Sequence, residues 1–240
     1  MKTALKINDL PVEIPASWDE LTFGQFLSIS KAQTDAEILS GVTGIELQLC
    51  DQVNPELLSI LLHPVIELMN ETPVVIDRPE VLGLPFPEKI GRKEFARKVN
   101  CDAAMKKLKG MELIGRVVSI YLCAGIQDKD IENFEKKVLG ENFICVFSAG
   151  QKLIEQLNKL NESEKKIPSP NYRSEEIRAG INDFKKYGVI SLVRGIALKW
   201  GISKDDVFKW SYNEVLLELK ISADENNYQR KLSEILNPKK

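Results

Sequence analysis

Hydrophobic and polar positions alternate only at the beginning of the chain, and elsewhere they follow a helical spacing. Residues 4–7 and 12–15 are two short alternating runs with turn-forming residues between them, which predicts a small N-terminal β-hairpin. After Pro15 apolar residues recur every three or four positions, as they do on one face of an α-helix. The pattern predicts a mainly α protein. We expect a multi-helix, bundle-like domain that begins with the hairpin and is followed by a C-terminal helical module.

Several helix beginnings are marked by residues that cap the free backbone amides of a first turn. Thr22 with Gln25, and Thr34 with Glu37, have the spacing of a capping box. Residues 54–55 are an Asn-Pro pair, in which asparagine caps and proline occupies the tolerated first position. The helix that begins there carries an apolar stripe expected to pack in the core: Leu57, Leu58, Leu61, Leu62, Val65 and Leu68.

Prolines interrupt the helical pattern at two places. Those between residues 72 and 92 prevent a continuous helix, and residues 73–76 are a candidate short strand that pairs with the hairpin. The second interruption, at residues 162–171, is polar and carries two prolines, as domain boundaries often do. We therefore predict a first domain over 1–161, a linker over 162–173 and a C-terminal module over 174–240. Between the interruptions we expect helices at residues 93–100, 103–124, 128–139 and 142–160.

In the C-terminal module, glycines and serines mark the expected helix ends. We expect helices at residues 174–187 and 189–200, and two more that begin after the capping serines Ser203 and Ser211. Gly188 is expected to end or bend the first of these helices, and Gly201 to stop the second. The last helix is expected to reach residue 236, with the polar residues 222–224 as an alternative break.

The charge balance argues against free binding to nucleic acid. The chain has 33 Lys and Arg against 35 Asp and Glu, a net charge of -2, whereas nucleic-acid-binding domains usually show a basic excess. The strongest basic cluster runs from Lys93 to Lys109; we interpret it as a solvated helix face, with an RNA or DNA contact as the alternative. The N-terminus lacks the apolar stretch of a signal peptide, and the apolar residues 113–126 are too few to span a bilayer. We expect a cytoplasmic protein that does not enter a membrane.

No motif indicates catalysis, a cofactor or a metal site. His63, the one histidine, lies within an apolar stripe, so no base is apparent for a Ser or Cys triad. The carboxylate pairs at 128/130 and 205/206 fall at expected helix starts, where they favour the helix dipole. The widely spaced cysteines are expected to be reduced core residues: Cys50, Cys101, Cys123 and Cys145. We expect no catalytic, cofactor-binding or metal-binding residue, no small-molecule substrate, and hence no enzyme.

Aromatic residues gather in the C-terminal module. Trp200, Phe208, Trp210 and Tyr212 lie within two short turns. Large aromatic side chains are enriched both in cores and in protein interfaces. We interpret these four as candidate partner-binding residues, with core packing at the helix junctions as the alternative.

Two stretches of the sequence resemble a known class of proteins. Residues 14–27 read IPASWDELTFGQFL and residues 39–45 read LSGVTGI; they resemble the start of tailed-bacteriophage tail-assembly and virion-associated proteins. Residues 186–188, 201–215 and 227–229 are similar to the C-terminal helices of chaperone-like phage proteins. The two regions that contain these matches, residues 14–45 and 186–229, make up about a third of the chain, and the stretch from 72 to 163 matches no family.

The resemblance implies a non-enzymatic role in phage morphogenesis. Such a protein would hold a tail component soluble until assembly, or would belong to the virion itself, with other phage structural or tail proteins as partners. It would be found in the host cytoplasm or in the virion. Three alternatives stay open: an adaptor or regulatory protein that uses the C-terminal aromatics, a nucleic-acid-associated protein that uses the face from Lys93 to Lys109, and an enzyme with an unfamiliar carboxylate site.

Overall fold

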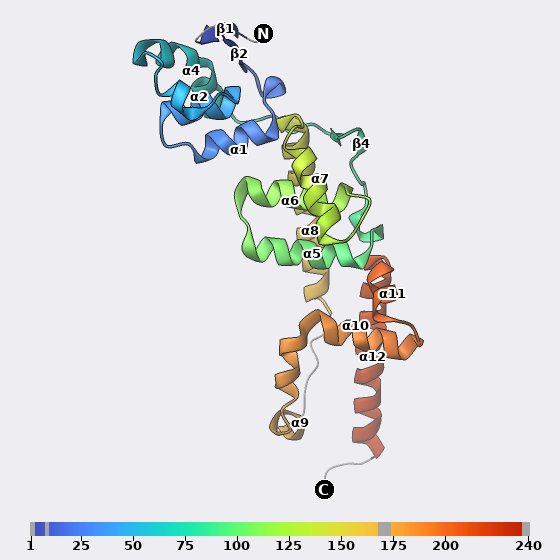
Figure 1. Cartoon of the computed structure of the whole chain (residues 1–240). Coiled ribbons are helices and arrows are strands. Elements are labelled where there is room, and N and C mark those ends of the chain that lie inside the picture. The colour runs from blue at the N-terminus through green and yellow to red at the C-terminus, as the bar shows by residue number, and fades with distance from the viewer. Residues whose placement is uncertain (1–2, 8–9, 168–173, 237–240) are drawn as a thin grey trace. The chain divides into compact units, whose positions relative to one another are not determined.

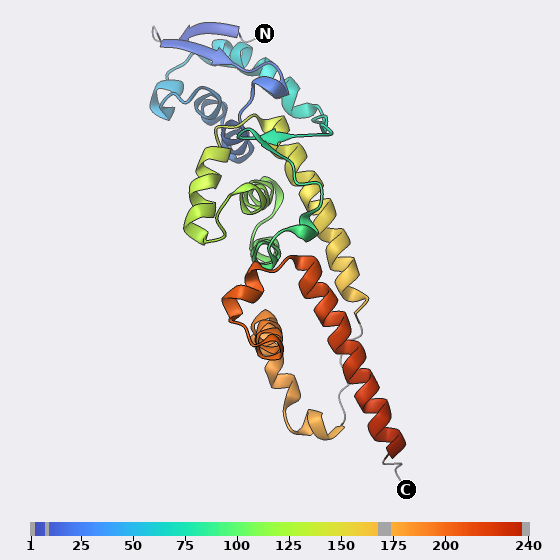
Figure 2. The ribbon, with the colours of Figure 1, turned by 90° about the vertical axis from the view of Figure 1, so that its right-hand side faces the viewer.

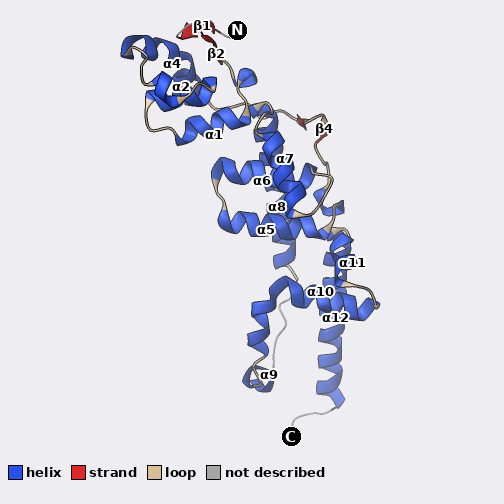
Figure 3. Cartoon of the chain, viewed as in Figure 1, coloured by secondary structure: helices blue, strands red, loops and turns tan. Residues whose placement is uncertain are grey.

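The computed structural model describes residues 3–7, 10–167 and 174–236. It is 73% helical, which confirms the mainly α prediction (Figure 3). The α-helices are α1 (Phe23–Lys31), α2 (Asp35–Thr43), α3 (Leu47–Cys50), α4 (Pro55–Asn70), α5 (Phe95–Lys107), α6 (Gly110–Leu122), α7 (Asp128–Val138), α8 (Phe143–Lys165), α9 (Ser174–Arg178), α10 (Gly188–Trp200), α11 (Lys204–Lys209) and α12 (Tyr212–Leu236). Short 3-10 helices are η1 (Trp18–Glu20), η2 (Ile90–Arg92) and η3 (Ile181–Tyr187).

The predicted N-terminal hairpin is present. Strand β1 (Thr3–Ile7) pairs antiparallel with β2 (Leu10–Ile14), and α2 and α4 pack against β2 (Figure 1). The candidate strand at residues 73–76 is wrong: these residues form a loop, in which the Ile76 amide donates to Ser148 Oγ at 3.0 Å. A second small hairpin forms a few residues later instead, between β3 (Glu80–Val81) and β4 (Leu84–Pro85). It forms there because Leu82 and Gly83 both adopt the left-handed backbone that a two-residue hairpin turn requires.

The chain divides into two compact units, and neither is continuous in sequence. The first contains residues 1–87 and 104–154, and the second contains residues 88–103 and 155–240. This division differs from the predicted boundary at 162–173, because α8 continues to Lys165 and its apolar side persists, with Leu157 buried and Leu160 packed against the core of the second unit. Within the predicted linker, residues 168–173 lie outside the described part of the chain.

In the first unit the predicted helix starts are confirmed. Thr22 with Gln25 and Thr34 with Glu37 form complete capping boxes, and the side chain of Asn54 accepts the Glu56 amide at 2.8 Å. The apolar stripe of α4 is buried over its later part, at Leu61, Leu62, Val65 and Leu68, whereas Leu57 is exposed. These starts were predictable because every atom of a cap lies within three residues of it.

An isolated antiparallel bridge between Thr22 and Asn142 joins two helix N-termini in the first unit. The amide of Phe23, the first residue of α1, donates to the carbonyl of Glu141, and the amide of Phe143, the first residue of α8, donates to the carbonyl of Leu21, both at 2.8 Å. The first amides of a helix have no partner within the helix. The reciprocal exchange therefore satisfies two of these donors at once.

The second unit repeats this arrangement with a bridge between Glu94 and Ser211. The amide of Phe95 at the start of α5 donates to Trp210 O at 2.7 Å, and the amide of Tyr212 at the start of α12 donates to Lys93 O at 3.0 Å. In both units an aromatic residue follows each bridging residue and begins the helix. We name these two arrangements the paired N-termini.

The core of the second unit lies between α5, α10, α11 and α12. Its buried side chains are Phe95, Val193, Ile196, Ala197, Val207, Tyr212 and Val215. The predicted stop at Gly201 and the caps at Ser203 and Ser211 are confirmed. The helix α12 passes through residues 222–224 without a break, as Figure 2 shows in red.

The helix expected over residues 174–187 is instead split into α9 and η3. Gly180 lies between them with φ at +87°, and a left-handed residue of this kind ends an α-helix. Gly188, which was expected to end or bend a helix, is the first residue of α10 and has φ at +44°.

Candidate protein-binding surface

The two tryptophans of the C-terminal aromatic group lie at the surface of the second unit and touch each other. Trp200 ends α10 with 56% of its surface exposed, and Trp210, just after α11, is half-buried. Their rings meet edge to face, with centres 5.9 Å apart and planes at 76°. This geometry is favourable for aromatic pairs, so Trp210 supports the exposed ring of Trp200.

The other two aromatics of the predicted group belong to the core. Phe208 is half-buried and stacks on Phe95, with ring centres 6.0 Å apart, and only 2% of Tyr212 is exposed. The four candidates therefore differ in burial: Trp200 is exposed, Phe208 and Trp210 are half-buried and pack against the core, and Tyr212 belongs to the core. Sequence spacing did not separate them, because α11 is too short for its periodicity to show which side faces the core.

Other apolar residues of α10 are exposed as well. Ile190 and Leu198 are exposed, whereas Val193, Ile196 and Ala197 are buried. Leu198 precedes Trp200 by two residues, which places it about 200° around the helix from that tryptophan. The sequence pattern did not indicate that Ile190 and Leu198 are exposed. The available signal was that α10 is apolar around more of its circumference than a single buried face requires.

A second exposed apolar stripe follows α12. It contains Leu217, Ile221, Tyr228 and Ile235, which are 58%, 41%, 61% and 75% exposed. Tyr212 and Val215 on the same helix are buried in the core of the second unit. Exposed apolar groups that gather in this way are typical of surfaces that bind other proteins.

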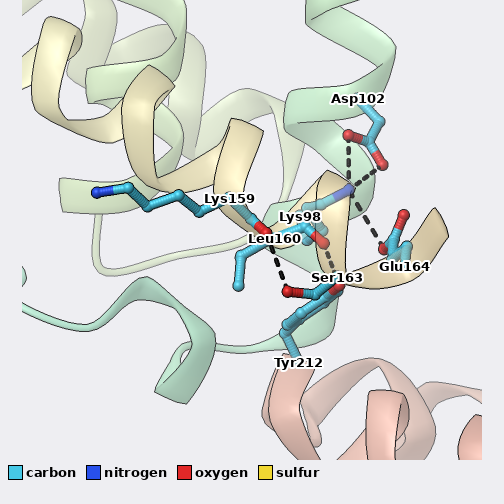
Figure 4. A network of polar contacts seen from close by, with 7 residues as sticks. All are labelled: Lys98, Asp102, Lys159, Leu160, Ser163, Glu164 and Tyr212. Atoms are coloured by element: carbon cyan, nitrogen blue, oxygen red, sulfur yellow. Dashed lines mark hydrogen bonds and ion pairs between the residues drawn. The ribbon is translucent and has the colours of Figure 1, made fainter. Parts of the chain in front are cut away.

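A buried cation connects α5, α8 and α12 within the second unit (Figure 4). Lys98 is only 1% exposed, and its Nζ lies 2.8 and 2.6 Å from the two carboxylate oxygens of Asp102 and 3.5 Å from Glu164 Oε1. The same nitrogen lies 5.8 Å from the centre of the Tyr212 ring. Its charge is fully engaged with protein groups, so the arrangement is a structural junction.

Tyr212 completes this junction through its hydroxyl group, which donates to the carbonyl of Leu160 at 3.3 Å. Burial raises the pKa of Tyr212 well above its ordinary value, and the negative charges of Glu164 and Asp102 raise it further. The hydroxyl therefore keeps its proton, and with it the hydrogen bond to α8, at neutral pH.

The basic cluster from Lys93 to Lys109 is the expected solvated face only in part, because two of its six basic residues are buried. Arg97 and Lys98 are buried, and Arg97 Nε lies 2.6 Å from Glu94 Oε2. Burial is the largest single influence on Glu94 and opposes its ionisation, but the hydrogen bond and charge of Arg97, a backbone hydrogen bond and the charge of Lys93 together outweigh it and lower the pKa of that carboxyl. Arg97 and Lys98 are buried because the first half of α5 packs in the second unit, where an inward-facing charge requires a partner. The exposed basic residues of the cluster are Lys93, Lys106, Lys107 and Lys109.

The residues that we considered for catalysis or metal binding lie in ordinary structural positions. His63 is exposed on α4, with Nε2 3.2 Å from Glu67 Oε1. The carboxylate pairs lie in the first turns of α7 and α11, as expected. Cys50, Cys101 and Cys123 are buried, and Cys145 is half-buried. Within the described part of the chain, no group of three or more His, Cys, Asp or Glu side chains is placed to hold a metal ion.

None of the described helices has both the length and the apolar character needed to cross a membrane. No protein-family model, curated protein or solved structure matches the chain. Both stretches that carry the phage resemblance contain bridge residues of the paired N-termini, at Thr22 and at Ser211.

Proposed function

We propose that this protein acts without catalysis in bacteriophage morphogenesis, as a tail-assembly chaperone or a virion component that binds other phage proteins. The proposed binding surface consists of Trp200 and Trp210. The phage context rests on the resemblance of residues 14–27 and 201–215, and the mode of action rests on the surface itself.

The observation that carries the proposal is the exposed position of Trp200 against the half-buried Trp210. A tryptophan ring held by a neighbour loses little conformational freedom when a partner covers it, and such rings are enriched among the residues that dominate binding energy. An apolar helical segment of a partner would suit this surface.

A cytoplasmic adaptor is the second candidate function, because it would use the same surface. The identity of the partner separates the two. A nucleic-acid-binding role is less well supported, since Arg97 and Lys98 are buried and paired with carboxylates, which removes two charges from the basic cluster.

The test is capture of purified phage tail-tube and tape-measure proteins by the wild-type protein and by the Trp200→Ala variant. We expect Trp200→Ala to abolish capture while its melting temperature stays near that of the wild type, because the ring is largely exposed. Ile60→Ala is the matched control, since Ile60 is an exposed apolar residue of the first unit, and it should retain capture.

Equal capture by the wild type and Trp200→Ala would overturn the proposed surface. Capture of purified host proteins, without any phage structural protein, would favour the adaptor instead.

A further inference from the structure

The exposed stripe of α12 has the spacing of a coiled-coil seam. Leu217, Ile221, Tyr228 and Ile235 follow one another at intervals of four, seven and seven residues, and all four are exposed. In a heptad pattern, Ile221, Tyr228 and Ile235 take equivalent positions, and Leu217 takes the other seam position. The stripe covers five turns of the helix and leaves the core-facing side of α12 to Tyr212 and Val215.

Two residues of opposite charge occupy the remaining seam positions. Asp224 and Lys231 lie seven residues apart, in the positions that follow Leu217 in the heptad pattern, and both are exposed. In a parallel pair of α12 helices each would lie beside its own copy, and like charges would meet. In an antiparallel pair each would lie beside a different residue. The charge pattern therefore favours an antiparallel partner.

Two copies of α12 are complementary when they lie antiparallel with Asn226 of one copy at the same level as Asn226 of the other. The seam contacts with the second copy would then be Leu217 to Ile235, Ile221 to the aliphatic stem of Lys231, and Tyr228 to Asp224. The last contact joins a phenol donor to a carboxylate acceptor, which is a strong kind of hydrogen bond. Each contact occurs twice, as in any two-fold interface.

The residues that flank the seam agree with this register. Lys220 of one copy would approach Glu234 of the other, so two pairs of opposite charge form at the edge. At the other edge the two copies of Glu225 would approach each other. Lys199 Nζ already lies 3.0 Å from Glu225 Oε2 within each chain, which offsets that repulsion.

We propose that α12 binds a second copy of this chain, in antiparallel orientation, through the seam from Leu217 to Ile235. The carrying observation is the self-complementary arrangement of apolar and charged residues on an exposed helix face. This inference goes beyond the proposed function, because it names a different partner and does not use the Trp200 and Trp210 surface.

The first test is the mass of the full chain by light scattering on a sizing column across a range of concentrations. We expect the wild type to approach twice the chain mass of 27.1 kDa and the variants Ile221→Glu and Tyr228→Glu to remain at the mass of one chain. Asn226→Glu is the matched control, because residue 226 lies on the side of α12 opposite the seam; it should still form dimers. A wild type that stays monomeric at its highest soluble concentration overturns the proposal, as does a Tyr228→Glu variant that dimerises normally.

A charge exchange tests the orientation. Lys220→Glu and Glu234→Lys should each weaken the dimer by roughly fivefold, since exposed ion pairs contribute little individually, and the double variant should recover affinity. Residues 220 and 234 lie about 21 Å apart along one helix, so recovery cannot come from a contact within the chain. In a parallel dimer Lys220 would meet Glu225 instead, and the double variant would not recover.

Glu234 also lies 4.0 Å from Arg230 on its own helix, so the recovery is measured against the Glu234→Lys single variant.

The capture assay with Trp200→Ala tests the proposed function separately from the self-pairing. A monomeric protein that still captures phage proteins through Trp200 would overturn the self-pairing alone, and a dimer that captures none would overturn only the proposed function.

Discussion

Lys98 lies against Tyr212, with its ammonium nitrogen 5.8 Å from the centre of the ring and its charge shared with Asp102 and Glu164. The four side chains come from α5, α8 and α12, so one buried cation connects three helices of the second unit. A buried ion pair adds little stability compared with a well-packed apolar core. Its main effect is on the register of packing: if the helices packed in another register, the buried Lys98 would lose a carboxylate partner.

Replacing Lys98 with methionine should destabilise the protein. The substitution keeps most of the side-chain volume but leaves Asp102 and Glu164 close together without a cation. Because both carboxylates are partly exposed to solvent, we expect a loss of roughly 1–3 kcal/mol in the free energy of unfolding, less than for a fully buried pair. Urea unfolding measures it. Lys159→Met removes an exposed pair with Glu155 and should change stability by less than about 0.5 kcal/mol; equal effects of the two variants would contradict the role of Lys98.

Tyr212 should make the protein sensitive to alkaline pH. Its pKa is raised in the folded protein above the value of about 10 expected in the unfolded chain. Below about pH 10 the contribution of this hydroxyl to stability should be fully present. Above about pH 10 the unfolded chain binds fewer protons than the folded one, so the free energy of unfolding should fall as pH rises. Tyr212→Phe should cost about 1 kcal/mol at neutral pH, from the hydrogen bond to Leu160. It should also reduce the fall above pH 10, by up to about 1.4 kcal/mol per pH unit. Identical slopes for the two proteins in urea titrations from pH 8 to 11 would rule this out.

The paired N-termini of the first unit require glycine at position 24. A β-carbon on Gly24 would lie 2.9 Å from the carbonyl oxygen of Leu139, which accepts the Gly24 amide at 2.8 Å. Gly24→Ala should therefore destabilise the protein by about 1–3 kcal/mol through overpacking against backbone.

Gly195 provides the opposite control. It lies in the middle of α10 with open space around it, so Gly195→Ala should stabilise by about 0.5–1 kcal/mol through higher helix propensity. Thermal unfolding followed by circular dichroism should shift in opposite directions for the two variants. A neutral or stabilising Gly24→Ala would show that the two segments do not approach so closely.

The cysteines should differ in their reaction with iodoacetamide. Burial raises the pKa of the Cys50 thiol, with the charge of Asp51 adding to it, and burial likewise raises the pKa of Cys145. Alkylation requires the thiolate, so both should react more slowly than free cysteine at pH 8 and faster as pH rises. Cys145, the half-buried one, should be modified first, and Cys50 and Cys101 only after unfolding. Peptide mass spectrometry reads the order, and early modification of Cys101 would contradict its burial.

Features that depend on neighbouring residues were predictable from the sequence, and features that depend on distant ones were not. The caps at Thr22, Thr34 and Ser203 follow from residues at most three positions away. The bridge between Thr22 and Asn142 joins residues far apart in the chain, and no local pattern marks such a partner. The same limit explains the mistaken reading of Lys98, whose neighbours on α5 suggest solvent while Glu164 and Tyr212 bury it.

The candidate surface was predictable only in part. Of the aromatic group, Trp200 is exposed and Trp210 is half-buried, but the group also includes Tyr212, which is buried. Partner binding through these residues stays a prediction. Deciding between these outcomes requires knowing which side of each short helix faces the core, and α11 is too short for its periodicity to show this.

The two bridges interleave along the chain, in the order Thr22, Glu94, Asn142, Ser211. No single cut between residues can separate two complete units, so fragments made at the polar stretch around residue 168 would each lack part of a core. On the ribosome, Thr22 must wait until Asn142 has been synthesised, and by then Glu94 has emerged without its own partner. Each incomplete unit exposes apolar helix faces during that interval. Both units are complete only when α12 has left the ribosome.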